Sequence, residues 1–129
     1  MSRVTLSTPD APAAIGPYAQ AIAVSARELV FLSGQVGIDP ATGALVDGGL
    51  EAQARQVMRN LGAVLSAASL TFDDVVRCTV YLTDLEQFGT VNAIYGSFFS
   101  AGRVPARATI QVSRLPKDAL VEIDAIAAR

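Results

Sequence analysis

The chain has 129 residues, of which 51% are apolar, and its 12 acidic and 10 basic residues give a net charge of −2 at pH 7. A chain of this length can bury its own core, so we expect a single domain over residues 1–129, and the near-neutral charge offers no basic surface to a nucleic acid. The single cysteine (Cys78), the short apolar runs and the polar N-terminus argue against an internal disulfide, a membrane span and a signal peptide, so we expect a cytoplasmic protein without a membrane partner.

The first part of the chain is predicted to form loops and short strands. Residues 8–18 contain three prolines and a glycine, which predicts a loop. The runs 19–24 and 29–33 are β-type, and the short stretch 25–28 between them indicates a hairpin. Residues 34–49 carry many turn-forming residues and are predicted to form a second loop.

Residues 50–68 have the 3.6-residue period of an amphipathic helix that packs one face on a sheet. The predicted apolar face consists of Leu50, Ala54, Val57, Met58, Leu61, Val64, Leu65 and Ala68. The predicted polar face consists of Glu51, Gln53, Arg55, Arg59 and Asn60.

The second half of the chain adds a strand, a helix and two further strands. An alternating strand is expected over residues 75–82, with Cys78 on its inward face. Thr83 or Asp84 would cap the helix that follows, whose apolar stripe includes Phe88 and Tyr95. The final strands are expected over residues 106–112 and 120–127.

The order β-β-β-α-β-α-β-β predicts an α+β fold, with one mixed sheet and both helices on one face. Side chains alternate along a strand, so Arg107 shares a face with Thr109, and Glu122 with Asp124. We expect Arg107 and Glu122 to lie together on the face away from the helices. Such a half-polar, uncovered face is a suitable surface for oligomer formation.

Arg107 and Glu122 are the chemically most informative residues of this pattern. The guanidinium group of an arginine can donate two parallel hydrogen bonds to a carboxylate, and a nearby glutamate can hold or activate a water molecule. The pair indicates a small site for a carboxylate-bearing metabolite. A surface ion pair of Glu122 with Arg107 or Arg114 would explain the same residues without any site.

The chain contains no histidine, which removes the commonest general base near neutral pH and a common zinc ligand. It also lacks a calcium loop and a glycine-rich phosphate loop. An enzyme built on this chain would therefore use carboxylates, hydroxyls, arginine and backbone groups, and we expect neither a metal nor a cofactor.

Five segments, taken together and in this order, resemble the RidA (YjgF) family of reactive intermediate deaminases. They are A-P-A-A-I-G-P-Y (11–18), S-G-Q-V-G-I-D-P-A-T-G (33–43), A-Q-A-R-Q (52–56), V-N-A-I-Y (91–95), and P-A-R-A with L-P-K-D-A-L-V-E-I-D-A-I-A (105–127). The resemblance implies a fold like that of Bacillus-type chorismate mutase, with a six-stranded mixed sheet, two helices on one face, and a homotrimer with clefts between subunits.

The resemblance also implies an activity that needs no cofactor. Members of the family hydrolyse 2-enamino and 2-imino acids, such as 2-aminoacrylate and 2-iminobutyrate, to 2-oxo acids and ammonia. By the matching motifs, Arg107 would bind the substrate carboxylate and Glu122 would position the water. The expected substrate-binding residues are Tyr18, Ser33, Gly34, Asn92, Tyr95 and Thr109.

This chain departs from the family pattern at two of these strand positions. Thr109 stands where the family often has a cysteine, and Asp124 stands where many members have a second glutamate. Two further interpretations remain open: a regulator that binds a carboxylate metabolite without turnover, and a chaperone-like trimer that acts through its surface. An endoribonuclease activity, also ascribed to the family, fits poorly with the slightly acidic charge.

Overall fold

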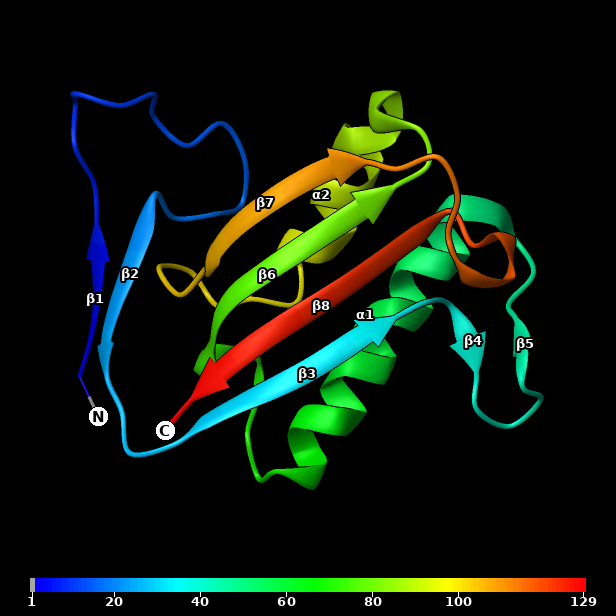
Figure 1. Cartoon of the computed structure of the whole chain (residues 1–129), viewed down its shortest axis with the longest axis horizontal. Helices are drawn as coiled ribbons and strands as arrows, with labels where there is room; N and C mark the ends of the chain where they lie inside the picture. Colours follow the sequence, from blue (N-terminus) through cyan, green and yellow to red (C-terminus); the bar gives the residue numbers. More distant parts are fainter. Residues whose placement is uncertain (1) are drawn as a thin grey trace.

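The computed structural model describes residues 2–129 and shows a four-stranded sheet with both helices on one face (Figure 1). The strand order is β3 (Leu29–Gln35), β8 (Val121–Ala128), β6 (Val75–Leu82) and β7 (Ala106–Gln111). The helices are α1 (Gly49–Ala67) and α2 (Phe88–Gly96). Because β6 and β7 run parallel and the other pairs antiparallel, the predicted α+β fold with a mixed sheet is confirmed.

The remaining elements are short and lie outside this sheet. β1 (Ser2–Leu6) and β2 (Ala21–Ser25) form an antiparallel pair, which together with the loop between them we call the ribbon, residues 2–25. β4 (Ile38–Asp39) and β5 (Ala44–Leu45) pair within the predicted loop 34–49. Three single turns of 3₁₀ helix precede longer elements: η1 (Phe72–Asp74), η2 (Leu85–Gln87) and η3 (Pro116–Asp118).

Two predictions about the strands are wrong. The sheet has four strands instead of six, and β2 does not pair with β3 as the expected hairpin, because it pairs with β1. The backbone N–H groups of Arg27 and Glu28, between β2 and β3, instead donate to the carbonyl oxygen of Arg129 at 2.8 Å. The turn thereby bends towards the C-terminus, and the ribbon stands apart from the outer edge of β3 (Figure 1).

The core lies between the sheet and the two helices. Alternate residues of β6 and β8 face it, including Cys78 and Val80 on β6 and Ile123 on β8, and the apolar face of α1 packs on them. Each fully buried aliphatic side chain of this kind stabilises a fold by about 1.5–3 kcal/mol. Among the described residues, no helix has the length and apolar character needed to span a membrane.

The amphipathic pattern placed α1 correctly but misassigned two of its side chains. Val64, predicted to be buried, is 40% exposed, whereas Gln53, predicted to be on the polar face, is only 7% exposed. The side-chain oxygen of Gln53 accepts the backbone N–H of Leu120 at 2.8 Å. Gly37 covers the same turn so closely that a Cβ on it would lie 2.8 Å from the Cα of Gln53.

Replacing Gln53 by leucine should therefore destabilise the protein. The part-buried N–H of Leu120 would lose its partner, which should lower the free energy of unfolding by about 0.5–1.5 kcal/mol. Urea denaturation measures this difference. Arg55→Ala, on the exposed side of the same helix, is the control and should change stability by less than about 0.5 kcal/mol. Equal stability of the Gln53→Leu protein and the wild type would show that the hydrogen bond is dispensable.

Candidate functional site

Arg107 lies on the face of the sheet that the helices cover. In the parallel pair of β6 and β7, Arg107 is opposite Cys78 and Thr109 is opposite Val80. Residues opposite each other in a sheet point to the same side, and Cys78 and Val80 belong to the core. The prediction that Arg107 lies on the open face is therefore wrong. Alternation shows which residues share a face, but it does not show which face the helices cover.

Three aromatic rings surround the guanidinium group of Arg107. Its Cζ atom lies 4.9 Å from the ring centre of Tyr95, 5.3 Å from that of Tyr18 and 5.6 Å from that of Phe88. At these distances the rings attract the positive charge and hold it in place. Nη1 also donates a hydrogen bond of 2.8 Å to the side-chain oxygen of Asn92 on α2. The side chain is thus held from β7, α2 and the loop of the ribbon.

The positive charge of Arg107 has no carboxylate partner among the residues that the structure describes. Burial lowers the pKa of Arg107 from its usual value, because the charged form loses contact with water. An anion that entered the site would restore the lost stabilisation and could receive two hydrogen bonds. The geometry is therefore that of an anion-binding site.

A pocket of about 200 Å³ opens above this guanidinium group, lined by Ile15, Tyr18, Phe88, Arg107 and Thr109. It is smaller than the pockets of about 300–1,000 Å³ that take drug-sized ligands. The loop residue Gly16 closes one side, where a Cβ would lie 3.4 Å from Nη2 of Arg107. The pocket therefore suits a small anionic metabolite.

Tyr95 supports the pocket from below and does not line its opening, since it is completely buried. Burial raises the pKa of its hydroxyl group, and it raises the pKa of the neighbouring Cys78 thiol to about 11. Both groups therefore stay protonated at neutral pH, and neither is available as a base there. The hydroxyl groups of Tyr95 and Thr109 are buried without a hydrogen-bond partner among the described residues.

The other predicted site residues lie on the opposite face of the sheet. Glu122 is opposite Tyr81 on β6, and both point away from the core. Ser33 and Gly34 form a bulge in β3, between the paired residues Leu32 and Gln35. A Cβ on Gly34 would lie 2.8 Å from Cδ of Glu122, so a glycine is needed to leave room for this carboxylate.

A hollow of about 320 Å³ on this open face includes Ser33 and Gly34, together with Arg77, Thr79 and Asp124. Asp124 accepts hydrogen bonds from the hydroxyl of Tyr81 at 3.0 Å and from the backbone N–H of Thr79 at 3.1 Å. The hydrogen bond to Asp124 is the largest cause of a raised pKa of Tyr81. Asp124 thus fixes the polar surface beside Glu122.

The predicted site residues consequently form two groups. One group surrounds the pocket on the helix side: Tyr18, Asn92, Tyr95, Arg107 and Thr109. The second group, Ser33, Gly34 and Glu122, lies on the open face. The sheet itself separates them, so one chain in this conformation cannot present Arg107 and Glu122 to the same small molecule.

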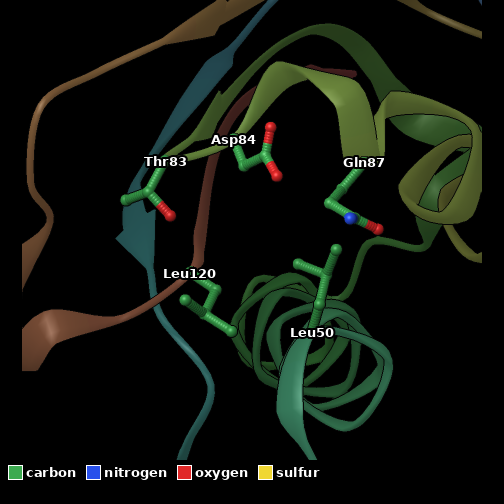
Figure 2. A pocket seen from close by; sticks show the side chains of 5 residues that line it. All are labelled: Leu50, Thr83, Asp84, Gln87 and Leu120. Carbon is green, nitrogen blue, oxygen red and sulfur yellow. The ribbon is translucent and has the colours of Figure 1, made fainter.

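A second pocket of about 320 Å³ contains none of the predicted site residues. Figure 2 shows Thr83, Asp84 and Gln87 on one side of it, with Leu50 and Leu120 opposite. The carboxylate of Asp84 accepts the backbone N–H of Glu86 at 3.1 Å and caps η2, the 3₁₀ turn that leads into α2. The sequence predicted Thr83 or Asp84 as the cap of the helix itself, but the N-cap residue of α2 is Gln87. Its acidic group gives this pocket no attraction for an anion. Nowhere in the described residues do three metal-ligating side chains cluster.

Phe88 and Gly16 belong to the Arg107 pocket, but neither was among the site residues expected from the sequence. Phe88 precedes Asn92 by four residues on α2, so both point to the same side of the helix, and this spacing could have revealed Phe88. Gly16 lies within the I-G-P-Y segment that also contains Tyr18. Its contribution is the space that it leaves beside Arg107 and Asn92.

The fold and the pocket define a class: small α+β proteins with an arginine-based anion pocket at a sheet edge. A family model described as Endoribonuclease L-PSP matches residues 8–129. The chain therefore belongs to this family, the RidA (YjgF) family.

Two curated relatives match nearly the whole chain. Protein DfrA of Myxococcus xanthus is 55% identical over 98% of this chain and 96% of its own length. The 2-iminobutanoate/2-iminopropanoate deaminase of Mus musculus is 51% identical over 97% of this chain and 90% of its own length.

Two solved structures of the family differ in how closely they match. The Rid family protein YyfB of Yersinia pestis is 30% identical and covers 100% of both chains with a TM-score of 0.89. E. coli TdcF, solved with bound serine, is 41% identical and covers 98% of both chains with a TM-score of 0.74. The structure more similar in sequence is thus the less similar in backbone.

Proposed function

We propose that this protein hydrolyses 2-imino and 2-enamino acids, such as 2-iminobutyrate and 2-aminoacrylate, to 2-oxo acids and ammonia. The observation that carries the proposal is the half-buried Arg107, a cation in a small pocket that has no carboxylate partner among residues 2–129. Relatives such as the 51%-identical mouse protein are named 2-iminobutanoate/2-iminopropanoate deaminases. The substrates in that name combine a carboxylate, which the pocket attracts, with an imine.

In this proposal Arg107 binds the substrate carboxylate through two parallel hydrogen bonds. Asn92 holds Nη1 at 2.8 Å, and the three rings prevent the guanidinium group from turning. The short side chain of the substrate would lie against the ring of Phe88 and Ile15 at the opening. Thr109 forms the floor beside the carboxylate. The substrate carbon that carries the nitrogen then has a fixed position.

The chemistry requires a water molecule and the transfer of protons. An enamine first gains a proton at its terminal carbon while its nitrogen loses one, and becomes the imine. The water oxygen then forms a bond to the imine carbon as the carbon–nitrogen π bond breaks, and one water proton passes to the nitrogen, which gives a carbinolamine. The second water proton passes from the new hydroxyl group to the nitrogen as the remaining carbon–nitrogen bond breaks, so that ammonia leaves and the 2-oxo acid remains. Glu122 would accept the proton of the water and return it to the nitrogen. Holding the substrate, the water and Glu122 in the right orientation provides much of the rate acceleration.

Glu122 must come from a second copy of the chain, because the sheet separates it from the Arg107 of its own chain. The open face that carries Glu122 also exposes Phe31, at 70% of its surface, and Ile110. Association of copies through this face would cover these side chains. We propose a homotrimer in which Ser33, Gly34 and Glu122 of one copy face the Arg107 pocket of the next, with one cleft at each interface.

A second candidate is a regulator that binds a carboxylate metabolite without turnover. The observation that favours it is that the Arg107 pocket contains a cation but no acidic side chain of the same chain. The related TdcF structure was solved with bound serine, which shares the carboxylate but has no imine. Hydrolysis of an imine distinguishes the two functions, since the regulator would bind 2-oxo acids and leave imines unchanged.

Replacing Arg107 should abolish catalysis without unfolding the protein. Arg107→Ala removes both hydrogen bonds to the carboxylate, and kcat/KM should fall by about 100-fold or more. The kcat/KM of Arg107→Lys should fall by a similar factor, because an ammonium group cannot donate two parallel hydrogen bonds to the carboxylate. The assay generates 2-iminobutyrate in situ and follows its capture by semicarbazide.

The control is Arg59→Ala, an exposed arginine on α1, which should retain full activity and the same Tm. Full activity of Arg107→Ala would contradict the role of the guanidinium group. Unchanged semicarbazone formation when the wild-type protein is added would contradict the deaminase function itself.

Glu122→Gln should separate turnover from binding. The amide preserves the size of the side chain but cannot accept a proton, so kcat should fall by about 10²–10⁴-fold. Affinity for a 2-oxo acid, measured by calorimetry, should stay within a few fold, because the carboxylate contacts remain. Retained kcat in Glu122→Gln would show that another group handles the water.

A further inference from the structure

One wall of the Arg107 pocket comes from a segment that buries little of its own surface. The loop between β1 and β2, residues 7–20, which we call the ribbon loop, brings Ile15 and Tyr18 to Arg107 (Figure 1). Residues 7–15 are all exposed to solvent. The hydrophobic core therefore does not fix the conformation of this wall, although the pocket depends on it.

The ribbon loop also has few hydrogen bonds between backbone groups. Among the described residues, the N–H of Tyr18 donates to the carbonyl oxygen of Gly16 at 2.8 Å, and the N–H of Ala19 donates to that of Pro105 at 3.0 Å. No other backbone–backbone hydrogen bond of the loop is present within residues 2–129. An exposed loop with so few backbone contacts samples many conformations unless side chains hold it.

The side-chain amide of Gln20 provides the contacts that the backbone lacks. Its Oε1 atom accepts the backbone N–H of Thr8 at 2.7 Å. Its Nε2 atom donates to the carbonyl oxygens of Pro12 at 2.7 Å, of Thr8 at 3.2 Å and of Ala11 at 3.4 Å. One amide thus holds the first half of the ribbon loop against the end of the same loop.

These contacts leave only residues 13–17 as a free arch above the pocket. A shorter arch with fixed ends has fewer conformations available to it. The hydroxyl group of Tyr18 accepts the backbone N–H of Ile15 at 3.2 Å and holds the arch from its inner side. The ring of the same tyrosine lies 5.3 Å from Cζ of Arg107. A continuous series of contacts therefore leads from the Gln20 amide to the guanidinium group.

We propose that Gln20 is a positioning residue for the Arg107 pocket, because its amide holds the ribbon loop in the conformation that places Tyr18 against the guanidinium group. Gln20 does not line the pocket itself, so it acts through Ile15 and Tyr18. When the loop is released, only the molecules with Tyr18 in place bind an anion at full strength, and the apparent affinity falls by that fraction. The inference rests on the proposed function, because it takes a 2-oxo or 2-imino acid as the ligand of the pocket.

Gln20→Met tests this role, since methionine keeps the length of the side chain but has no amide group. Calorimetry with 2-oxobutyrate should show a Kd raised about ten-fold and an unchanged number of binding sites, as expected when about a tenth of the loops are in place. In the imine assay KM should rise while kcat is retained, because Glu122 is unchanged. Hydrogen exchange of the Ile15 amide, followed by NMR, should become faster as the arch loosens.

The matched control is Gln56→Met on α1. The Gln56 amide donates to Oδ1 of Asn60 at 2.8 Å within the helix, so its loss should leave both the Kd and the exchange of Ile15 as in the wild type. An unchanged Kd or an unchanged Ile15 exchange rate in Gln20→Met would overturn the proposal. Fewer binding sites at the wild-type Kd would also overturn it, because that result indicates partial unfolding.

The two readouts separate this proposal from the proposed function. If the wild-type protein bound 2-oxobutyrate but left imines unchanged, the deaminase function would fail, and the Kd of Gln20→Met would still decide the role of Gln20. If the wild-type protein bound no 2-oxo acid, the assignment of the pocket would fail, and this role of Gln20 would fail with it.

Discussion

The site depends on one unbalanced charge. Arg107 is half buried at the edge of a sheet, and aromatic rings and an amide oxygen hold it where no carboxylate of the described chain reaches it. Burying a cation without a partner costs free energy, and the fold offsets part of this cost with the rings of Tyr18, Phe88 and Tyr95. The rings offset only part of the free-energy cost of burying this cation, and an anion can offset the rest, so the pocket attracts an anion. The parallel pairing of β6 and β7 creates this arrangement, because it places Arg107 opposite Cys78 and beside α2.

The second constraint is that a sheet has two faces. Glu122 and the bulge at Ser33 and Gly34 lie on the face away from the helices, while Arg107 lies on the covered one. A carboxylate next to Arg107 in the same chain would form an ion pair and remove the attraction for substrate. In the proposed homotrimer another copy would supply the carboxylate, so the pocket of a single chain stays cationic. The same association would cover the exposed Phe31.

The sequence predicted the two helices and the four strands of the main sheet well, because these depend on local periodicity. The motif pattern also named Arg107 and four residues that the structure brings around it, Tyr18, Asn92, Tyr95 and Thr109, but it did not name Phe88 or Gly16. The period of α1 and the alternation of β6 are direct consequences of burying one face. Three features depended on contacts between distant segments and could not be predicted in this way: the burial of Gln53, the face on which Arg107 lies, and the separation of β2 from β3. In each case the partner, Leu120, α2 or Arg129, is far away in the sequence. The alternation of side chains along a strand carries no information about contacts with such distant segments.

The central claim is that Arg107 and Glu122 act together only across an interface between copies. Mixing two inactive variants tests it most directly: Arg107→Ala and Glu122→Gln chains are co-expressed with different tags, the mixed assemblies are purified, and imine hydrolysis is measured. In a randomly mixed cyclic assembly, about a quarter of the clefts combine an intact arginine with an intact glutamate from its neighbour. The account predicts recovery of about that fraction of wild-type activity. Activity no higher than that of the two separate variants, in assemblies shown to contain both chains, would contradict it.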